Sequence, residues 1–153
     1  VALLLGRALR DVVVLLGQAV IITVLSLAFG LRVALGYLLL IYVLLALIGL
    51  GTAAISYAVA LRLRAEDSLS NLMTALTQPI LLLSGILLPM SFAPVWLQHI
   101  AEWNPFYWAV NSARALAAGD LYHHHVWQGM AVIAALAVVS LLWATREFRR
   151  SIR

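Results

Sequence analysis

Cysteine and lysine are both absent from the 153 residues. Without cysteine the chain can form no disulfide and can perform no thiolate chemistry. Charged residues are also scarce, at 10% of the chain, whereas a soluble domain carries roughly a quarter. Hydrophobic residues make up 65%, and the mean hydropathy is +1.04. This composition is that of an integral membrane protein.

The motifs of a catalytic domain are missing as well. There is no Walker, GxGxxG or zinc-protease motif, and the few acidic residues are scattered without a nucleophile–base pair. The adjacent His123, His124 and His125 cannot all point to one ion from a regular helix, so we interpret them as a solvated loop. We therefore expect no catalytic residue, no metal site and no cofactor on this chain.

Four segments are long and apolar enough to cross a bilayer, which takes a helix of about 20 residues. They cover residues 12–31, 37–61, 69–89 and 126–145. Two short amphipathic helices, at about 94–103 and 105–118, lie between the third and fourth spans. Such segments are typical of backbone that dips into the membrane or lies on it. We therefore predict one all-α integral membrane domain over residues 1–153, with four transmembrane helices and two short re-entrant or extracytoplasmic helices.

The two short helices have clear start and stop signals. Pro94 begins the first, and Asn104 with Pro105 gives the second an N-cap followed by proline at the first helical position. Gly119 is the expected C-terminal stop. The second helix is expected to carry an apolar stripe of Phe106, Val110, Ala113 and Ala117. The aromatic residues of this region should form an interfacial belt at one depth: Trp96, Trp103, Trp108, Tyr122 and Trp127.

The arginines orient the spans. If the spans alternate, eight of the ten basic residues fall on one side, which the excess of positive charge marks as cytoplasmic. Both ends of the chain are then cytoplasmic, and the region 90–125 is outside. A basic tail directly after a span indicates topology and contact with anionic lipid, not binding of nucleic acid. The eight residues are Arg7, Arg10, Arg62, Arg64, Arg146, Arg149, Arg150 and Arg153.

The region between the third and fourth spans carries a resemblance to a known family. Its features, in order, are Ser84-Gly85, Pro89, Pro94-Val95-Trp96-Leu97, Asn104-Pro105 and Arg114-Ala115. This ordered set of motifs resembles the corresponding region in the permease subunits of type-2 ABC exporters, in particular the drug and antibiotic exporters typified by daunorubicin-resistance permeases. Pro89, Pro94, Glu102, Asn104, Pro105 and Arg114 are the expected structural residues of the two outer helices.

The resemblance implies a function and a set of partners. Two permeases, identical or different, would pair with two cytoplasmic ABC ATPase subunits that hold ATP and Mg²⁺, in a bacterial inner membrane. The exported substrate would be a drug, an antibiotic, a lipid or a glycan. Family permeases have six spans, so we expect this chain to be the C-terminal portion of a longer protein. Residues 1–11 would be the tail of the segment that docks on the ATPase.

Several polar residues are candidates for function, each with a structural alternative. Asn71, Thr74 and Gln78 share one face of the third span, as a wall of the substrate pathway or as partners in interhelical hydrogen bonds. Glu102 and Arg114 could form an ion pair or could both be hydrated. The small residues Gly49, Gly51, Ala53 and Ala54 could serve helix packing or a contact between permeases. The candidates for coupling to the ATPase, or for topology and lipid contact, are Arg7, Arg10, Asp11, Arg62, Arg64, Glu66 and Asp67.

Two other classes of protein remain as alternatives. A secondary transporter or channel should show ionisable residues at mid-membrane depth or inverted repeats, and the sequence displays neither. A structural membrane scaffold would pair without contacting an ATPase and would have a dry interior behind Gln78.

Overall fold

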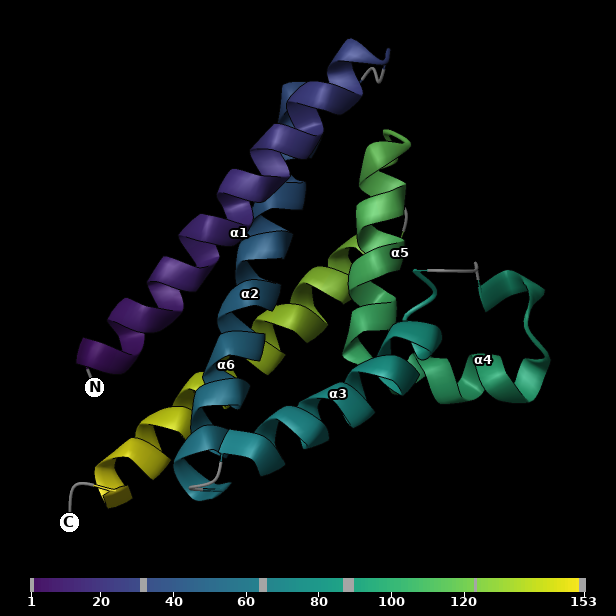
Figure 1. Cartoon of the computed structure of the whole chain (residues 1–153). Helices are drawn as coiled ribbons and strands as arrows, with labels where there is room; N and C mark the ends of the chain where they lie inside the picture. The colour runs from purple at the N-terminus through teal and green to yellow at the C-terminus, as the bar shows by residue number, and fades with distance from the viewer. Residues whose placement is uncertain (1, 31–32, 64–65, 87–89, 123, 152–153) are drawn as a thin grey trace.

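The computed structural model describes residues 2–30, 33–63, 66–86, 90–122 and 124–151. These residues form six α-helices and one 3₁₀ turn, and no strand occurs among them. Both termini and the junction of the second and third helices lie toward the same end of the molecule (Figure 1). The elements are α1 (Ala2–Ala28), α2 (Leu35–Leu63), α3 (Glu66–Leu83), η1 (Met90–Phe92), α4 (Val95–Glu102), α5 (Pro105–Ala117) and α6 (His124–Ser151).

Three of the described helices are long and apolar enough to cross a membrane: Gly6–Ala28, Leu35–Leu61 and Val126–Phe148. The predicted third span, over 69–89, is not confirmed as a single helix of that length. α3 has 18 residues and ends at Leu83, six residues before the predicted end of the span. The first half of α3 is polar, and a turn follows Leu83 directly, so the apolar run cannot extend as one helix.

α2 is the central helix, and it packs against α1, α3, α5 and α6. Small residues make the close contacts possible, because they let helix backbones approach. A Cβ at Gly49 would lie 3.4 Å from the Leu15 side chain of α1, and one at Gly51 would lie 3.4 Å from the Ala137 backbone of α6. Further along the same contact with α6, Ala54 is fully buried. Helix packing within the chain is therefore the role of Gly49 and Gly51.

α5 and α6 approach each other even more closely, at Gly129. A Cβ placed there would lie 1.9 Å from the Ser112 hydroxyl and 2.7 Å from the Trp108 carbonyl oxygen. Only glycine fits this crossing. The buried face of α5 consists of Ala109, Ser112 and Leu116. The predicted apolar stripe of Phe106, Val110, Ala113 and Ala117 is therefore wrong by about one position, because the close approach of α6 at Gly129 turns Ser112 and its neighbours on that face inward.

The local signals of the two short helices are confirmed. The Asn104 side chain accepts a hydrogen bond from the Phe106 backbone N–H at 3.1 Å, and Pro105 occupies the first turn. Gly119 follows the helix with a φ of 82°, the left-handed conformation that glycine adopts without strain. Pro94 precedes α4 in an extended conformation without a side-chain cap. The start of α5 is fixed by these contacts, which place its first turn beside α3.

Four of the five aromatic residues expected to form an interfacial belt are exposed: Trp96, Trp103, Tyr122 and Trp127. Their position at one membrane depth stays a prediction. α5, which follows Trp103, packs against α2 and α6 (Figure 1).

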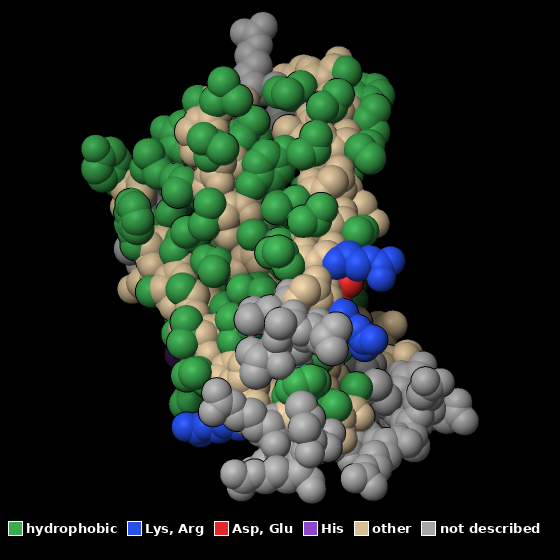
Figure 2. All heavy atoms as spheres, turned by 90° about the vertical axis from the view of Figure 1, so that its left-hand side faces the viewer, with side chains coloured by type: hydrophobic (Ala, Val, Ile, Leu, Met, Phe, Trp, Pro, Cys, Tyr) green, Lys and Arg blue, Asp and Glu red, His purple; other side chains and the backbone are tan. Residues whose placement is uncertain are grey.

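The outer face of α1 is a surface for lipid or for other protein. Figure 2 shows hydrophobic side chains over most of this face, with basic side chains confined to its lower part. The exposed apolar residues of α1 include Leu9, Val13, Val14, Val20, Ile21, Ile22, Val24, Leu25 and Leu27. Arg7 and Arg10 are exposed near the N-terminal end of the helix.

Candidate functional site

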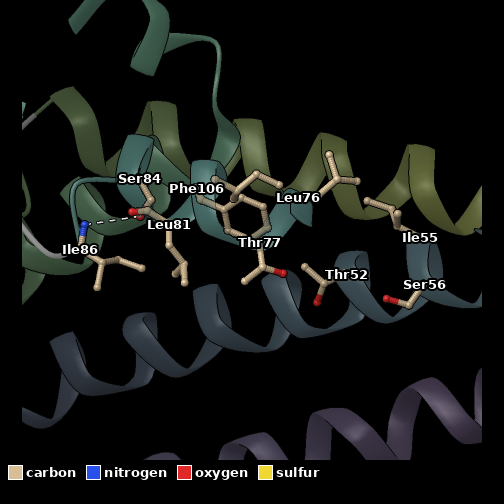
Figure 3. A pocket seen from close by; sticks show the side chains of 10 residues that line it. Thr52, Ile55, Ser56, Leu76, Thr77, Leu81, Ser84, Ile86 and Phe106 are labelled. Atoms are coloured by element: carbon tan, nitrogen blue, oxygen red, sulfur yellow. Dashed lines mark hydrogen bonds between the residues drawn. The ribbon is translucent and has the colours of Figure 1, made fainter. Parts of the chain in front are cut away.

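A cavity of about 340 Å³ lies between α2, α3 and the first turn of α5 (Figure 3). Threonine and serine side chains from α2 and from α3 or its end face it, and the remaining lining is apolar. On the α3 side the lining residues Leu76 and Ile86 are exposed, so the cavity is partly open there. The lining consists of Thr52, Ile55, Ser56, Leu76, Thr77, Ile80, Leu81, Ser84, Ile86 and Phe106.

The hydroxyl groups of this cavity are partly committed to the backbone. The Thr52 hydroxyl donates to the Ile48 carbonyl at 2.8 Å, one turn earlier in α2. The Ser84 hydroxyl donates to the Leu81 carbonyl at 2.7 Å. The Ser84 oxygen also accepts from the Ile86 N–H at 3.4 Å. The cavity wall is thus weakly polar, and the Thr52 oxygen keeps lone pairs that can accept a hydrogen bond.

A second hollow, of about 290 Å³, lies between α1 and α2. Thr52 and Ser56 line both hollows. Here the Tyr57 hydroxyl donates to Asp11 Oδ2 at 2.5 Å, which joins α1 to α2 near the end that carries the termini. The two hollows flank one polar strip of α2, so any movement of α1 or α3 changes the surroundings of that strip.

Two polar contacts from α5 and its N-cap hold the C-terminal end of α3. Arg114 donates through Nη2 to the Gly85 carbonyl at 2.6 Å, and Asn104 donates through Nδ2 to the Ile80 carbonyl at 3.0 Å. Gly85 is buried and has a φ of 76°, so the chain leaves α3 in a left-handed turn. These two contacts fix the edge of the cavity where Ser84 and Ile86 stand.

The ion pair that the sequence left open, between Glu102 and Arg114, is not formed in the described part of the chain. Arg114 contacts Gly85 instead, and Glu102 Oε2 lies 3.6 Å from His99 Nδ1 on the exposed side of α4. The Glu102 backbone carbonyl accepts a hydrogen bond from Trp108 Nε1 at 2.8 Å, which ties α4 to α5. The structural role of Glu102 is therefore a backbone role.

The residues expected to line a pathway, Asn71, Thr74 and Gln78, do not line this cavity. All three are exposed on α3, and Thr77, beside them in sequence, lines the wall together with Thr52 of α2. The sequence analysis did not identify Thr52 and Ser56 as candidate site residues. Their spacing of four residues on an otherwise small and apolar helix is the signal that could have identified them.

The residues expected to couple to an ATPase lie at one end of the molecule. Arg7, Arg10 and Asp11 belong to the first turns of α1, and Arg62 belongs to the last turn of α2. Glu66 and Asp67 begin α3. Arg64, Pro89 and His123, together with the side chains of Arg62, Glu66, Asp67, His124 and His125, lie outside the described residues.

Together, the three apolar helices, the hairpin of α4 and α5 and the cavity beside α3 define a multi-pass helical membrane protein. The family comparison makes this more specific. A family model described as ABC-2 type transporter matches residues 1–117, and the chain belongs to that family. A domain of this family is a membrane transport component and is not itself catalytic. Comparison with curated proteins and comparison with solved structures each give no significant match.

Proposed function

We propose that this chain is the membrane-spanning part of an ATP-driven ABC exporter, in which the cavity between α2, α3 and α5 belongs to the translocation pathway. The observation that carries the proposal is the position of that cavity. It is bounded by α3, whose helix ends at Leu83 in a turn, and by the first turn of α5, a short helix that packs against α2 and α6. Irregular backbone at membrane depth is tolerated where it lines a pathway or is buried in protein.

The charged end of the bundle is the proposed contact with the ATPase. Arg7 and Arg10 are exposed there, and the adjacent Asp11 is bonded to Tyr57 of α2. A push on the start of α1 would pass to α2 through this hydrogen bond and through the packing of Leu15 on Gly49. α2 forms one wall of the cavity, so the push would change the cavity's shape. The side facing the ATPase is then cytoplasmic, in agreement with the distribution of arginines.

The remaining partners follow from the same proposal. Most of α3 from residue 74 onward is exposed, and so is the apolar face of α1. These two exposed faces would pack against further transmembrane helices and against a second permease copy, identical or different. We propose a bacterial plasma membrane as the location. The substrate would be a drug, an antibiotic, a lipid or a glycan.

Copurification with an ABC-type ATPase subunit, the one encoded nearest to this protein first, tests the proposal without knowledge of the substrate. The expected result is a detergent-stable complex whose ATP hydrolysis depends on the permease. Arg7→Glu combined with Arg10→Glu should weaken the complex, whereas Arg146→Glu in the last turns of α6 should weaken it less. Transport that is driven by an ion gradient and proceeds without ATP would contradict the proposal. So would failure to bind any ABC-type ATPase of the same genome.

A further inference from the structure

No described residue that lines the cavity beside α3 is charged, and this limits the kind of ligand that the cavity can bind. Among the described residues that line it, the polar atoms belong to the hydroxyls of Thr52, Ser56, Thr77 and Ser84 and to the backbone. Ile55, Leu76 and the Phe106 ring provide most of the remaining surface, and Thr77 of α3 faces Thr52 of α2 across the space (Figure 3).

An ionised ligand would find no counter-charge in this lining. Moving an unpaired carboxylate or ammonium group from water into apolar surroundings is strongly unfavourable. Of the lining residues of the two hollows, Asp11 alone is ionisable to a carboxylate; it lies on the α1 side of α2, and the Tyr57 hydroxyl already occupies one of its oxygens. The lining therefore selects against both anions and cations.

The direction of the hydroxyl hydrogen bonds restricts the class of ligand further. The Thr52 proton is directed to the Ile48 carbonyl, and the Ser84 proton is directed to the Leu81 carbonyl. A threonine or serine hydroxyl has one proton and two lone pairs, and the Ser84 oxygen already accepts from the Ile86 N–H at 3.4 Å. The Thr52 oxygen can therefore act toward a ligand only as a hydrogen-bond acceptor. A ligand that donates a hydrogen bond is matched to Thr52, and one that only accepts is not.

From these observations we infer that the cavity binds a neutral, mainly apolar molecule that carries a hydroxyl or amide N–H donor, with Thr52 as the acceptor. The inference rests on the proposed function and specifies the substrate class of the same site. A volume of about 340 Å³ is near the lower end of the range for pockets that enclose small organic ligands. The exposed rim at Leu76 and Ile86 allows entry from the α3 side.

Four pyrene derivatives of matched shape test the inference by fluorescence titration of the purified protein in lipid nanodiscs. They are 1-pyrenemethanol, its methyl ether, 1-pyrenemethylammonium and 1-pyrenecarboxylate. Partition into empty nanodiscs is measured in parallel and subtracted. The alcohol should bind most tightly, roughly three- to tenfold more tightly than the ether, which is the value of one neutral hydrogen bond. The two charged probes should bind more weakly than either.

Variants assign the binding to this cavity. Thr52→Val keeps the side-chain shape and removes the acceptor, so it should abolish the preference for the alcohol over the ether while leaving ether binding unchanged. Thr145→Val is the matched control, because the Thr145 hydroxyl donates to Leu142 within α6 and does not line the cavity. Ile55→Trp should fill the space and weaken both neutral probes.

Four results would each overturn the inference: tighter binding of a charged probe than of the alcohol, equal binding of alcohol and ether, equal effects of Thr52→Val on both neutral probes, or no saturable binding of any probe. The copurification experiment separates the two proposals. A stable, ATP-hydrolysing complex that binds the wrong probe contradicts only the ligand class. A protein that binds the alcohol but no ATPase contradicts the proposed function.

Discussion

Replacing Gly129 by alanine should separate α5 from α6 and destabilise the bundle. The new Cβ would lie 1.9 Å from the Ser112 hydroxyl oxygen and 2.7 Å from the Trp108 carbonyl oxygen. The hydroxyl could rotate away only by giving up its 2.7 Å hydrogen bond to that same carbonyl, in a fully buried position. The carbonyl is backbone and cannot rotate. Restoring an ordinary carbon–oxygen contact of about 3.3 Å requires the helices to move apart by roughly 0.6 Å.

The size of the effect follows from two opposing contributions. Overpacking of a close contact costs about 1–3 kcal/mol. Alanine also favours the helix over glycine by about 0.8–1 kcal/mol, which offsets part of that cost. We expect Gly129→Ala to lower the free energy of unfolding by up to about 2 kcal/mol, the difference of these contributions. Gly17→Ala is the matched control in α1, because a Cβ there meets nothing within 4 Å, and it should be neutral or slightly stabilising.

Thermal or detergent-induced unfolding of the purified variants, followed by tryptophan fluorescence, measures both effects. A double-mutant cycle with Ser112→Gly assigns the clash, since two of the three short contacts at Gly129 belong to Ser112. Ser112→Gly should cost less in the Gly129→Ala background than in the original protein. Equal unfolding midpoints for Gly129→Ala and Gly17→Ala, or strict additivity in the cycle, would refute the reasoning.

Three further substitutions test the polar contacts around the cavity by the same unfolding measurement. Arg114→Ala removes the bond to the Gly85 carbonyl and should cost about 1 kcal/mol, below the usual value for a charged donor because Arg114 is exposed, with partial recovery in Arg114→Lys; no loss would contradict the contact. Asn104→Ala should cost about 0.5–2 kcal/mol through loss of the N-cap, in addition to the bond to the Ile80 carbonyl; Asn104→Asp loses that bond too but still accepts from the Phe106 N–H, so it should cost less than Asn104→Ala, and equal losses would show that the cap contributes nothing. Tyr57→Phe should cost about 1 kcal/mol by breaking the bond to Asp11, and an unchanged midpoint would remove that bond from the proposed path of coupling.

The features that the sequence predicted correctly are those decided by local chemistry. The long apolar runs became α1, α2 and α6 because about twenty apolar residues form a helix in a membrane whatever their neighbours are. Asn104, Pro105 and Gly119 set the ends of α5 through bonds and dihedral angles within a few residues.

The features that were missed depend on contacts between distant segments. The buried face of α5 is set by Gly129, which lies on another helix, and a single glycine in an apolar run does not reveal its partner. Arg114 donates to a backbone carbonyl 29 residues away, a partner that was neither Glu102 nor water, the two alternatives considered from the sequence. The polar strip of the cavity came from Thr52 and Ser56, because the orientation of α2 toward α3 is a property of the packed bundle.

Thiol labelling at Thr77→Cys, in the complex with the ATPase subunit, tests most directly whether the cavity is a translocation pathway. The chain contains no cysteine, so the introduced thiol reacts without background. Val139→Cys is the control, since Val139 lies on the exposed apolar surface of α6. With a small water-soluble maleimide, the labelling rate at Thr77→Cys should differ between the nucleotide-free and ATP-trapped states, while the rate at Val139→Cys stays the same. Equal rates at Thr77→Cys in both states, or a parallel change at Val139→Cys, would contradict the account.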